Sequence, residues 1–405
     1  MSVSSSKRAV VVGSSFAGMT AALELRKRLD AQHEVVVLDP HADFTFIPSL
    51  IWLPFGMREP KDVTFPLAPM YAKQGIRFIN EAATGFDLDA HTLTTSSGQE
   101  LSYDRLMLAT GPRLAFEKVP GLGPVDGHTQ SVCNLEHALL TRGAWERFLE
   151  NPGPVVVGTA QGGSCFGASY EFLLNTQHQI KKAGLQDVAP LTFITAEPFL
   201  GHFGLGGVSD SQKRVEKFFD KLGIEGIPNN IITAVRDGEI ELDGGRVLPF
   251  AFAMIVPPFT GVDAIRQTEG LGNPMGFLPV NDEFRHTDIE DVYGAGVDIA
   301  IAPPQQTLVP AGVPKTGQMS EVMAKVAAQN ITADLQGGGR RSMPMSEMEA
   351  ICILDAGNNG IIFKADHVLG TSEHPHVMTG PQAHWAKIAF ERIFLASRKR
   401  GRVVL

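Results

Sequence analysis

The sequence predicts an α/β fold built from two tandem Rossmann-like domains, followed by a C-terminal amphipathic region. Two segments carry this prediction, residues 9–39 and 154–197, because each reads as a buried strand, a glycine-rich turn, a helix and a second strand that ends near an acid. A third observation is the length of 405 residues, which is enough for two or three domains with ample cores. A small scaffold held together by disulfides is therefore excluded.

Composition narrows the class further. Hydrophobic residues make up 43% and charged residues 20% of a chain with 42 Gly and 26 Pro, which is typical of a globular, loop-rich protein and excludes a disordered chain or a long coiled coil. The net charge of -9 argues against nucleic acid as the main partner, since phosphate binding needs a cationic surface. Three cysteines, Cys133, Cys165 and Cys352, are too few for a disulfide framework. They are either buried spectators or redox groups.

The first unit begins with the apolar run Ala9–Val12 and reaches Asp39 through a glycine turn, a helix and a strand. The helix N-terminus offers free N–H groups to a pyrophosphate, and Asp39 is placed to accept ribose hydroxyls. The turn departs from G-x-G-x-x-G because Ser15 stands at its middle position, where we expect the hydroxyl to donate to a phosphate oxygen. The alternative is a strand, turn and helix without a ligand. The cofactor-binding residues expected here are Gly13, Ser15, Ala17, Gly18 and Asp39.

The second unit repeats the pattern with a strand over 154–158, a turn, a helix from Ala168, and a strand over 191–195 that ends near Glu197. Two such units in one chain indicate a flavoprotein in which the first binds FAD and the second ordinarily binds NAD(P)H. Cys165 stands at the start of the second helix, which is abnormal for an NAD site.

Three further segments fit a flavoprotein. Residues 106–111 and 291–298 are apolar strands that break at small residues, where backbone must approach a cofactor, and the second implies that the chain returns to the first domain. Residues 313–317 lead into a helix whose N-terminus would stabilise negative charge on a reduced flavin. The cofactor-binding residues expected in these segments are Ala109, Thr110, Gly111, Gly296, Lys315 and Thr316.

The C-terminal region is basic and amphipathic, which favours a membrane surface over an ordinary packing helix with a solvated end. Its six cations face only Glu391; they are Lys387, Arg392, Arg398, Lys399, Arg400 and Arg402. The longest uncharged stretches are about 16 residues and are broken by Pro-Pro pairs, so no spanning helix is expected. The polar N-terminus predicts no signal peptide. The domains expected are 1–112 with 282–335, then 113–281 with Cys133 and Cys165, and 336–405 with Cys352.

At this point the sequence resembles the sulfide:quinone oxidoreductases, membrane-surface flavoenzymes of the glutathione-reductase-like fold that are related to flavocytochrome c sulfide dehydrogenase and type II NADH dehydrogenases. The resemblance covers nearly the whole chain in order. It rests on the segments Gly163-Ser164-Cys165-Phe166-Gly167, Gly201-His202-Phe203-Gly204-Leu205-Gly206-Gly207, Phe252-Ala253-Met254-Ile255-Val256-Pro257-Pro258-Phe259 and Gly312-Val313-Pro314-Lys315-Thr316-Gly317, and on Cys352 before Asp355.

The resemblance implies that Cys165 and Cys352, 187 positions apart (352 minus 165), form a redox pair on the flavin face opposite NAD-type chemistry. Hydrosulfide would attack their disulfide or sulfur bridge, leave a persulfide on Cys165 and free the Cys352 thiolate to pass two electrons to FAD. Thiolate is the reactive form, and we expect the helix N-terminus to lower the pKa of Cys165. The alternative is that all three cysteines are small buried hydrophobes.

The resemblance also assigns the remaining catalytic residues. Cys133 would assist turnover or, as in some members, bind the flavin covalently, and His137 and His202 would handle protons at the sulfide site, since histidine titrates near neutral pH. Each histidine is otherwise an ordinary hydrogen-bonded polar group. No metal is expected, because the spacing of the late histidines matches no closed zinc pattern. These histidines are His367, His374, His376 and His384.

A membrane quinone would reach the flavin beside Lys387 and Phe390, with Phe44 as a second stacking ring. The expected partners are sulfide, quinone and the lipid surface on the cytoplasmic side, with no nucleic acid, and a homo-oligomer is left open. The alternatives are a type II NADH:quinone oxidoreductase, disfavoured by Cys165, and a periplasmic sulfide dehydrogenase, disfavoured by the missing export signal. A redox-sensing flavoprotein without turnover is a third, and it would lack a quinone route.

Overall fold

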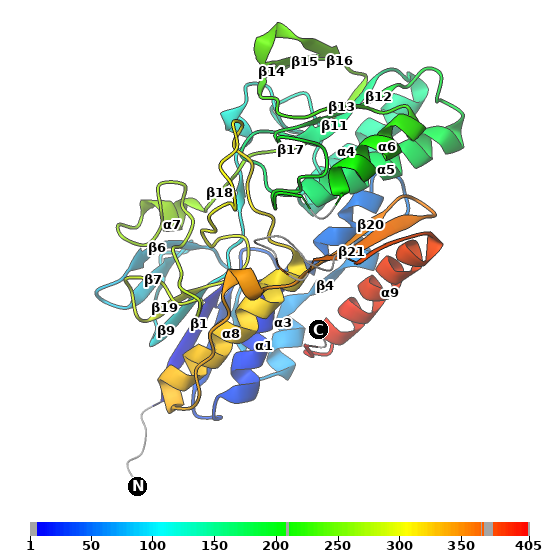
Figure 1. Cartoon of the computed structure of the whole chain (residues 1–405). Helices are drawn as coiled ribbons and strands as arrows, with labels where there is room; N and C mark the ends of the chain where they lie inside the picture. The colour runs from blue at the N-terminus through cyan, green and yellow to red at the C-terminus, as the bar shows by residue number, and fades with distance from the viewer. Residues whose placement is uncertain (1–5, 208–209, 366, 368–375, 404–405) are drawn as a thin grey trace.

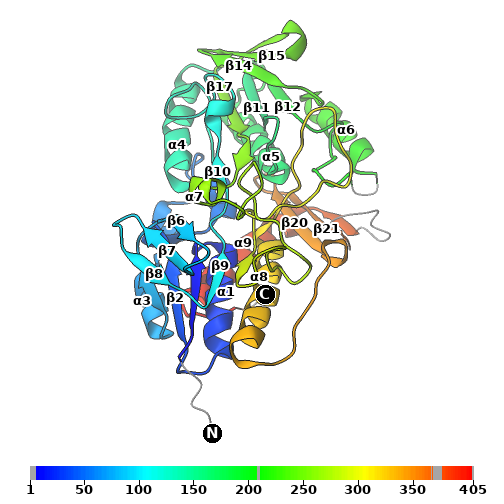
Figure 2. The ribbon, with the colours of Figure 1, turned by 90° about the vertical axis from the view of Figure 1, so that its left-hand side faces the viewer.

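The structure, a computed structural model, describes residues 6–207, 210–365, 367 and 376–403. Two parallel α/β sheets lie at opposite ends of the molecule, and a small antiparallel sheet with the last helix flanks them (Figures 1 and 2). Among the described residues, no helix is long and apolar enough to cross a bilayer.

The first sheet is parallel and has the order β19-β9-β1-β2-β5. Its strands are β1 (Arg8–Val12), β2 (Glu34–Leu38), β5 (Arg77–Ile79), β9 (Arg105–Leu108) and β19 (Val292–Gly294). Side chains alternate across it: Val11 and Val37 belong to the apolar core that includes helices α1 (Phe16–Arg28) and α8 (Gly317–Gln336), whereas Val10 and Val36 belong to a separate core on the opposite face. Burial on both faces explains why these strands are continuous runs of valine and leucine.

The second sheet is also parallel, with the order β13-β12-β11-β17. Its strands are β11 (Val155–Thr159), β12 (Leu191–Thr195), β13 (Glu225–Ile227) and β17 (Phe252–Val256), and its helices are α4 (Leu135–Glu150), α5 (Phe166–Ala183) and α6 (Ser211–Leu222). The predicted strand, turn, helix and strand pattern is therefore confirmed in both units. Helix α5 begins two residues earlier than expected, so that Cys165 is its N-cap residue.

Shorter elements complete both units. They are β3 (Asp43–Thr45), η1 (Ile47–Trp52), α2 (Pro60–Val63), β4 (Thr64–Pro66), α3 (Leu67–Lys73), β6 (Ala83–Asp87), β7 (Thr92–Thr95), β8 (Glu100–Ser102), β10 (Arg113–Leu114), η2 (Phe116–Lys118), β14 (Ile232–Arg236), β15 (Glu239–Leu242), η3 (Asp243–Gly245), β16 (Val247–Pro249), β18 (Phe259–Thr260), α7 (Asp263–Gln267) and η4 (Met345–Glu347). Strand β10 pairs with β18, which ties together the two segments that join the first unit to the second.

The C-terminal region forms the antiparallel sheet β20 (Ala350–Asp355), β21 (Gly360–Ala365) and β22 (His376–Thr379), followed by helix α9 (Pro381–Arg398). Strand β20 and helix α9 run side by side along one flank of the molecule (Figure 1). Cys352 lies on β20 and pairs in register with Phe363 of β21.

Two of the six cations in the predicted basic C-terminal region, Lys387 and Arg398, are buried. Arg398 is 1% exposed and forms an ion pair with Glu321 of α8, and its guanidinium also contacts the Thr20 hydroxyl of α1 at 3.2 Å. Lys387 is 3% exposed and pairs with Glu171 of α5. Both cations therefore fasten α9 to the two α/β units.

Replacing Arg398 by alanine is expected to lower the free energy of unfolding by about 3–5 kcal/mol, because the substitution leaves the Glu321 carboxylate buried without its cation. Urea unfolding measures the change. The matched control is Arg400→Ala, which removes an exposed cation two residues away and should change stability by less than about 0.5 kcal/mol. Equal effects of the two substitutions would contradict an anchoring role for Arg398.

Candidate active site

The turn between β1 and α1 is closed tightly enough to hold a pyrophosphate against backbone. Gly13 has φ of +100° and lies against the carbonyl of Ala109, and Gly18 lies against the carbonyl of Gly13, so a Cβ at either glycine would overlap backbone. Ser15 is the N-cap residue of α1, and its hydroxyl makes no capping hydrogen bond. The first-turn N–H groups of α1 and this hydroxyl are donors suited to phosphate oxygens.

Asp39 helps to build this turn as well as ending the second strand. Its carboxylate accepts a hydrogen bond from the Ser14 N–H at 2.6 Å and from the His41 N–H at 2.8 Å, and it also contacts the His41 ring. The hydrogen bond and charge of Asp39 raise the pKa of His41 despite partial burial. The side chain of Asp39 is thereby fixed at the edge of the site that sequence analysis assigned to a ribose.

The start of α8 forms the other side of the same cradle. Thr316 is its N-cap and accepts a hydrogen bond from the Met319 N–H at 3.3 Å. Gly296 packs against Ala17 of α1, where an added Cβ would lie 3.2 Å from the Ala17 methyl group. Gly111 has φ of +72°, so the β9 strand leaves the sheet through a left-handed residue. The predicted cofactor residues of three distant segments therefore meet in one place.

Asp298 is a further candidate that sequence analysis did not select. It is fully buried, accepts hydrogen bonds from the N–H of Thr110 at 2.9 Å and from its hydroxyl at 3.3 Å, and its Oδ1 has no partner within the described part of the chain. Burial raises the pKa of Asp298 to about 7 and lowers that of the neighbouring Lys315 to about 8. A buried acid directly after Gly294-Ala295-Gly296-Val297 was the available signal. Its unpartnered oxygen is an acceptor for a cofactor hydroxyl.

The glycine turn before α5 packs directly on the segment that leads into α8. The Gly312 N–H donates to the Gly163 carbonyl at 3.0 Å, and the Gly162 N–H donates to the Pro310 carbonyl at 2.7 Å. The N-termini of α1, α8 and α5 consequently converge, each bringing the positive end of a helix dipole. Such a place stabilises anions, whether phosphate, reduced flavin or thiolate.

The three cysteines gather at the start of α5. Cys165 is exposed at the N-cap, and the Cys352 sulfur lies 3.5 Å from the position that a Cβ on Gly167 would occupy. The charge of a Cys165 thiolate would raise the pKa of both Cys133 and Cys352, which places Cys165 within electrostatic reach of the other two. The fold thus brings together Cys165 and Cys352, which are 187 positions apart in the chain (352 minus 165).

The pKa of Cys165 is shifted upward, opposite to the expected lowering. Desolvation by the surrounding protein raises the pKa of Cys165, and the hydrogen bond from the Ala168 N–H at the helix N-terminus only reduces that rise. Burial likewise raises the pKa of Cys133 and of Cys352 to about 12 each. Burial therefore favours the protonated form of all three thiols.

Glu171 and Lys387 form a buried ion pair whose charges act on Cys352. Glu171 of α5 accepts a hydrogen bond from Lys387 of α9 and another from the Asp355 N–H at 2.7 Å. Burial raises the pKa of Glu171 to about 7, although Lys387 opposes the rise. Burial is the main cause of the raised pKa of Cys352. The negative charge of Glu171 raises this pKa further, and the positive charge of Lys387 lowers it. The pair is thus placed to control the thiol electrostatically.

Substituting Glu171→Gln is expected to lower the pKa of Cys352, because the change removes a negative neighbour and leaves the Lys387 cation in place. The rate of Cys352 alkylation as a function of pH, in protein with serine at positions 133 and 165, reports this pKa. Glu146→Gln, on the exposed surface of α4, is the control and should leave the profile unchanged. An upward shift in the Glu171 variant would contradict the interpretation.

The two predicted catalytic histidines are both poor proton acceptors in this state. Burial lowers the pKa of His137 and of His202, and each has one ring nitrogen without a partner among the described residues. His137 packs edge-on against Phe116, and the Nδ1 of His202 accepts a hydrogen bond from the Gly204 N–H at 3.1 Å. Gly204 lies against the Gly312 carbonyl, so the loop of His202 contacts the same segment that supports the glycine turn of α5.

The acid that ends the second strand of the second unit is unavailable to a ribose. Glu197 is fully buried, and its carboxylate accepts hydrogen bonds from Tyr170 at 3.0 Å, Thr195 at 2.8 Å and the Phe203 N–H at 2.6 Å. Burial raises the pKa of Glu197 to about 7. In a nucleotide-binding unit an acid at this position holds ribose hydroxyls, whereas here it holds the loop of His202.

The residues predicted to bind quinone do not all lie together. Phe44 is 2% exposed and stacks on Phe65 and Phe394, and the half-buried Phe390 lies 5.9 Å from Phe394, measured between ring centroids. Lys387 instead lies over Trp52, with its nitrogen 5.0 Å from the ring centroid, beside Glu171. Phe390 and Phe394 of α9 therefore belong to the aromatic cluster with Phe44, whereas Lys387 of the same helix contacts Trp52 and Glu171.

Among the described residues, no group of three or more His, Cys, Asp or Glu side chains is arranged to hold a metal ion. His384 contacts the Asp355 carboxylate at 2.6 Å, and the ring of His367 contacts the Ser346 carbonyl at 2.7 Å. His374 lies outside the described residues.

Comparison with known proteins agrees with this geometry. The profile of the family described as "Pyridine nucleotide-disulphide oxidoreductase" matches residues 7–324. The "Sulfide-quinone reductase" of Aquifex aeolicus is 37% identical over 98% of this chain and 92% of its own, and the crystal structure of the sulfide:quinone oxidoreductase from that bacterium superposes with a TM-score of 0.92 over the same shares. An "NADH dehydrogenase-like protein" of Mycobacterium tuberculosis is 28% identical over 73% of each chain.

The fold and its cradle define a flavoprotein, and the chain belongs to the pyridine nucleotide-disulphide oxidoreductase family. Within that family it is a member of the sulfide-quinone reductases. The predicted fold class and the FAD cofactor are both confirmed. The tight glycine turn, the free Ser15 hydroxyl and the unpartnered Asp298 oxygen fit FAD, which these residues would hold.

Proposed function

We propose that this chain oxidises sulfide to polysulfide or sulfur and passes the electrons through FAD to a membrane quinone. One observation carries the proposal: Cys165 and Cys352 meet at the helix N-terminus where a nicotinamide nucleotide would otherwise bind. The occupied Glu197 carboxylate supports it, because the second unit then lacks an acceptor for the ribose of NADH.

The sulfur chemistry proposed uses the two cysteines in turn. Hydrosulfide attacks a disulfide or sulfur bridge between them, so that a sulfur–sulfur bond forms on Cys165 while the bond to Cys352 breaks. The electron pair of the broken bond stays on the Cys352 thiolate. Re-forming the sulfur bridge between this thiolate and the Cys165 persulfide would release two electrons and a proton, and bound FAD would be the oxidant that takes the electrons. His137 and His202 are the groups proposed to accept the proton that hydrosulfide brings.

Bound FAD supplies a two-electron acceptor that also reacts with quinones. The protein residues have separate proposed duties around it. Asp298 and Thr110 bind and orient the cofactor, and Lys315 with the positive end of α8 favours negative charge on its reduced form. Ser15 donates to its phosphates, and Asp39 accepts from the ribose.

The quinone is proposed to arrive from a lipid surface against which the protein lies without crossing it, on the cytoplasmic side. Phe390 and Phe44 would contribute aromatic contacts to the quinone, and Lys387 would hydrogen-bond or protonate a quinone oxygen. Exposed apolar side chains on the C-terminal region support such a surface, including Trp385 at 65% and Ile393 at 55% exposure.

Anaerobic flavin absorbance tests the proposal on purified protein. Sulfide should bleach the oxidised flavin, a short-chain quinone should restore it, and NADH should leave it unchanged. Bleaching by NADH but not by sulfide would replace the proposal with an NADH:quinone reaction. Bleaching by sulfide without recovery on adding quinone would show that the electron acceptor is another molecule.

A further inference from the structure

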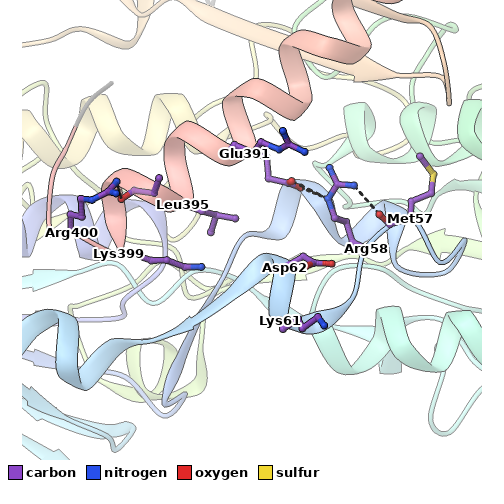
Figure 3. A pocket seen from close by; sticks show the side chains of 10 residues that line it. Met57, Arg58, Lys61, Asp62, Glu391, Leu395, Lys399 and Arg400 are labelled. Carbon is purple, nitrogen blue, oxygen red and sulfur yellow. Dashed lines mark hydrogen bonds and ion pairs between the residues drawn. The ribbon is translucent and has the colours of Figure 1, made fainter.

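A cationic pocket of about 680 Å³ lies between the segment around α2 and the last turns of α9 (Figure 3). It is lined by Met57, Arg58, Lys61, Asp62, Glu391, Arg392, Leu395, Ala396, Lys399 and Arg400. Five of these residues are cations and two are acids, in a protein whose net charge is -9. The pocket therefore reverses the charge of the molecule locally.

Both acids of the pocket are already bound. The Glu391 carboxylate accepts hydrogen bonds from the Arg58 guanidinium at 2.9 Å and 3.0 Å and from the Ser49 hydroxyl, and Asp62 accepts one from the Glu59 N–H at 2.8 Å. In Figure 3 the Arg58–Glu391 pair lies at one end of the pocket and Arg400 at the other. Only Glu391 is paired with a cation, Arg58, whereas Asp62 accepts a neutral backbone N–H and keeps its negative charge. Five cations therefore face two acids, and the pocket carries an excess of positive charge.

Lys61 and Arg392 are exposed and make no side-chain hydrogen bond or ion pair with any residue that the structure describes. Lys399 is also exposed, and its nitrogen lies 6.0 Å from the centroid of the Phe65 ring. Cations at the end of a helix normally offset its dipole, which fits Lys61 in the short helix α2 and Lys399 at the C-cap of α9, but Arg392 is two turns from the end of α9. Helix stabilisation therefore does not account for Arg392, nor for the gathering of cations from two separate helices in one pocket.

The exposed face of α9 continues from this pocket as an apolar surface. Trp385, Arg392, Ala396 and Lys399 follow one another at spacings of seven, four and three residues, which puts them on one side of the helix. Trp385 is 65% exposed, and Ile393 at 55% exposure lies next to this stripe. Exposed tryptophan and isoleucine beside unpaired lysine and arginine is the pattern of a helix that lies in the interface of a bilayer.

We propose that this pocket binds the phosphate headgroup of an anionic phospholipid. Lys61, Arg392 and Lys399 bind the phosphate, while Trp385 and Ile393 enter the boundary between headgroups and acyl chains. The proposal goes beyond the quinone reaction because it assigns a ligand to residues that have no part in the sulfide or flavin chemistry. It commits to a lipid rather than free phosphate because the apolar side chains lie on the same face as the cations.

Vesicle cosedimentation of the FAD-loaded protein tests the proposal, with phosphatidylcholine vesicles that contain or lack phosphatidylglycerol. The unmodified protein should prefer the anionic vesicles, and the variant Lys61→Gln/Arg392→Gln/Lys399→Gln should bind them on the order of 100-fold more weakly. The matched control, Lys213→Gln/Lys217→Gln/Lys221→Gln on α6, removes the same charge at the other end of the molecule and should keep the preference.

If both triple variants lost the same amount of affinity for anionic vesicles, the pocket assignment would be wrong, because the net charge of the protein alone would then explain the binding. Calorimetric titration with inorganic phosphate distinguishes the source: tight phosphate binding without any preference for anionic vesicles would overturn the lipid assignment. Sulfide-dependent reduction of a water-soluble quinone should be the same in the pocket variant and the unmodified protein. If the unmodified protein did not carry out that reaction, the proposed function would be contradicted. The vesicle experiment would still test the headgroup site, because it does not depend on enzyme activity.

Discussion

Alanine at Cys165 or at Cys352 is expected to slow sulfide-driven flavin reduction by about 1000-fold or more, while FAD stays bound. Without Cys165 no sulfur atom receives the persulfide, and without Cys352 no thiolate carries the electron pair onward, so each substitution removes a covalent step. FAD should remain because its cradle is built from the starts of α1 and α8, not from these side chains. Stopped-flow absorbance after mixing with sulfide measures the rate.

The third cysteine provides the matched control for this prediction. Cys133 is held close to Cys165, yet we propose an auxiliary role, so Cys133→Ala should keep the first reduction and slow only repeated turnover. Chemical reduction with dithionite should bleach all three variants equally, which shows that their flavin is intact. Full sulfide activity in either the Cys165 or the Cys352 variant would remove the proposed mechanism.

Replacing Gly18 by alanine is expected to abolish FAD binding and to destabilise the protein by about 1–3 kcal/mol. Gly18 lies in the first turn of α1, where a Cβ would overlap the Gly13 carbonyl oxygen and approach the Ala109 methyl group to 3.4 Å. The added atom must push the helix away from the turn, and the N–H donors proposed for the pyrophosphate move with it. Flavin content of the purified protein and thermal unfolding measure the two effects.

Gly85→Ala is the control for that substitution. Gly85 lies in β6 with open space around the position of a Cβ and without a left-handed φ, so the same methyl group meets nothing there. Its flavin content should equal that of the unmodified protein. Retention of FAD in the Gly18 variant would contradict the assignment of this turn to the cofactor.

Much of the fold was predictable from local pattern. The run Ala9–Val12 and the strand over 191–195 are buried on both faces, so their apolar sequence identifies them without any tertiary information. The position of the first turn is also predictable from its glycine, because Gly13 adopts a positive φ that few other residues tolerate. The catalytic roles of the cysteines and the domain boundaries stay predictions, which activity measurements and dissection of the chain can test.

The site was less predictable wherever a partner comes from far along the chain. Lys387 and Arg398 look like surface cations in the sequence, but Glu171 and Glu321 on other helices bury them. Glu197 looks like a ribose acceptor because it follows a second strand, but Tyr170 of α5, 27 residues earlier in the chain, donates a hydrogen bond to its carboxylate. Local sequence records the chemistry of a side chain, whereas burial and pairing depend on contacts that only the folded chain creates.

The position of Cys352 on β20 has a consequence for how the protein is made. During translation both parallel sheets and helix α8 are complete in sequence before β20 leaves the ribosome, since α8 ends at Gln336 and β20 begins at Ala350. We expect nascent chains to fold the cofactor cradle first and to gain the second thiol only with the final segment. Because Cys133 and Cys165 leave the ribosome before Cys352, we expect sulfide oxidation to begin only in molecules whose cofactor cradle is already complete.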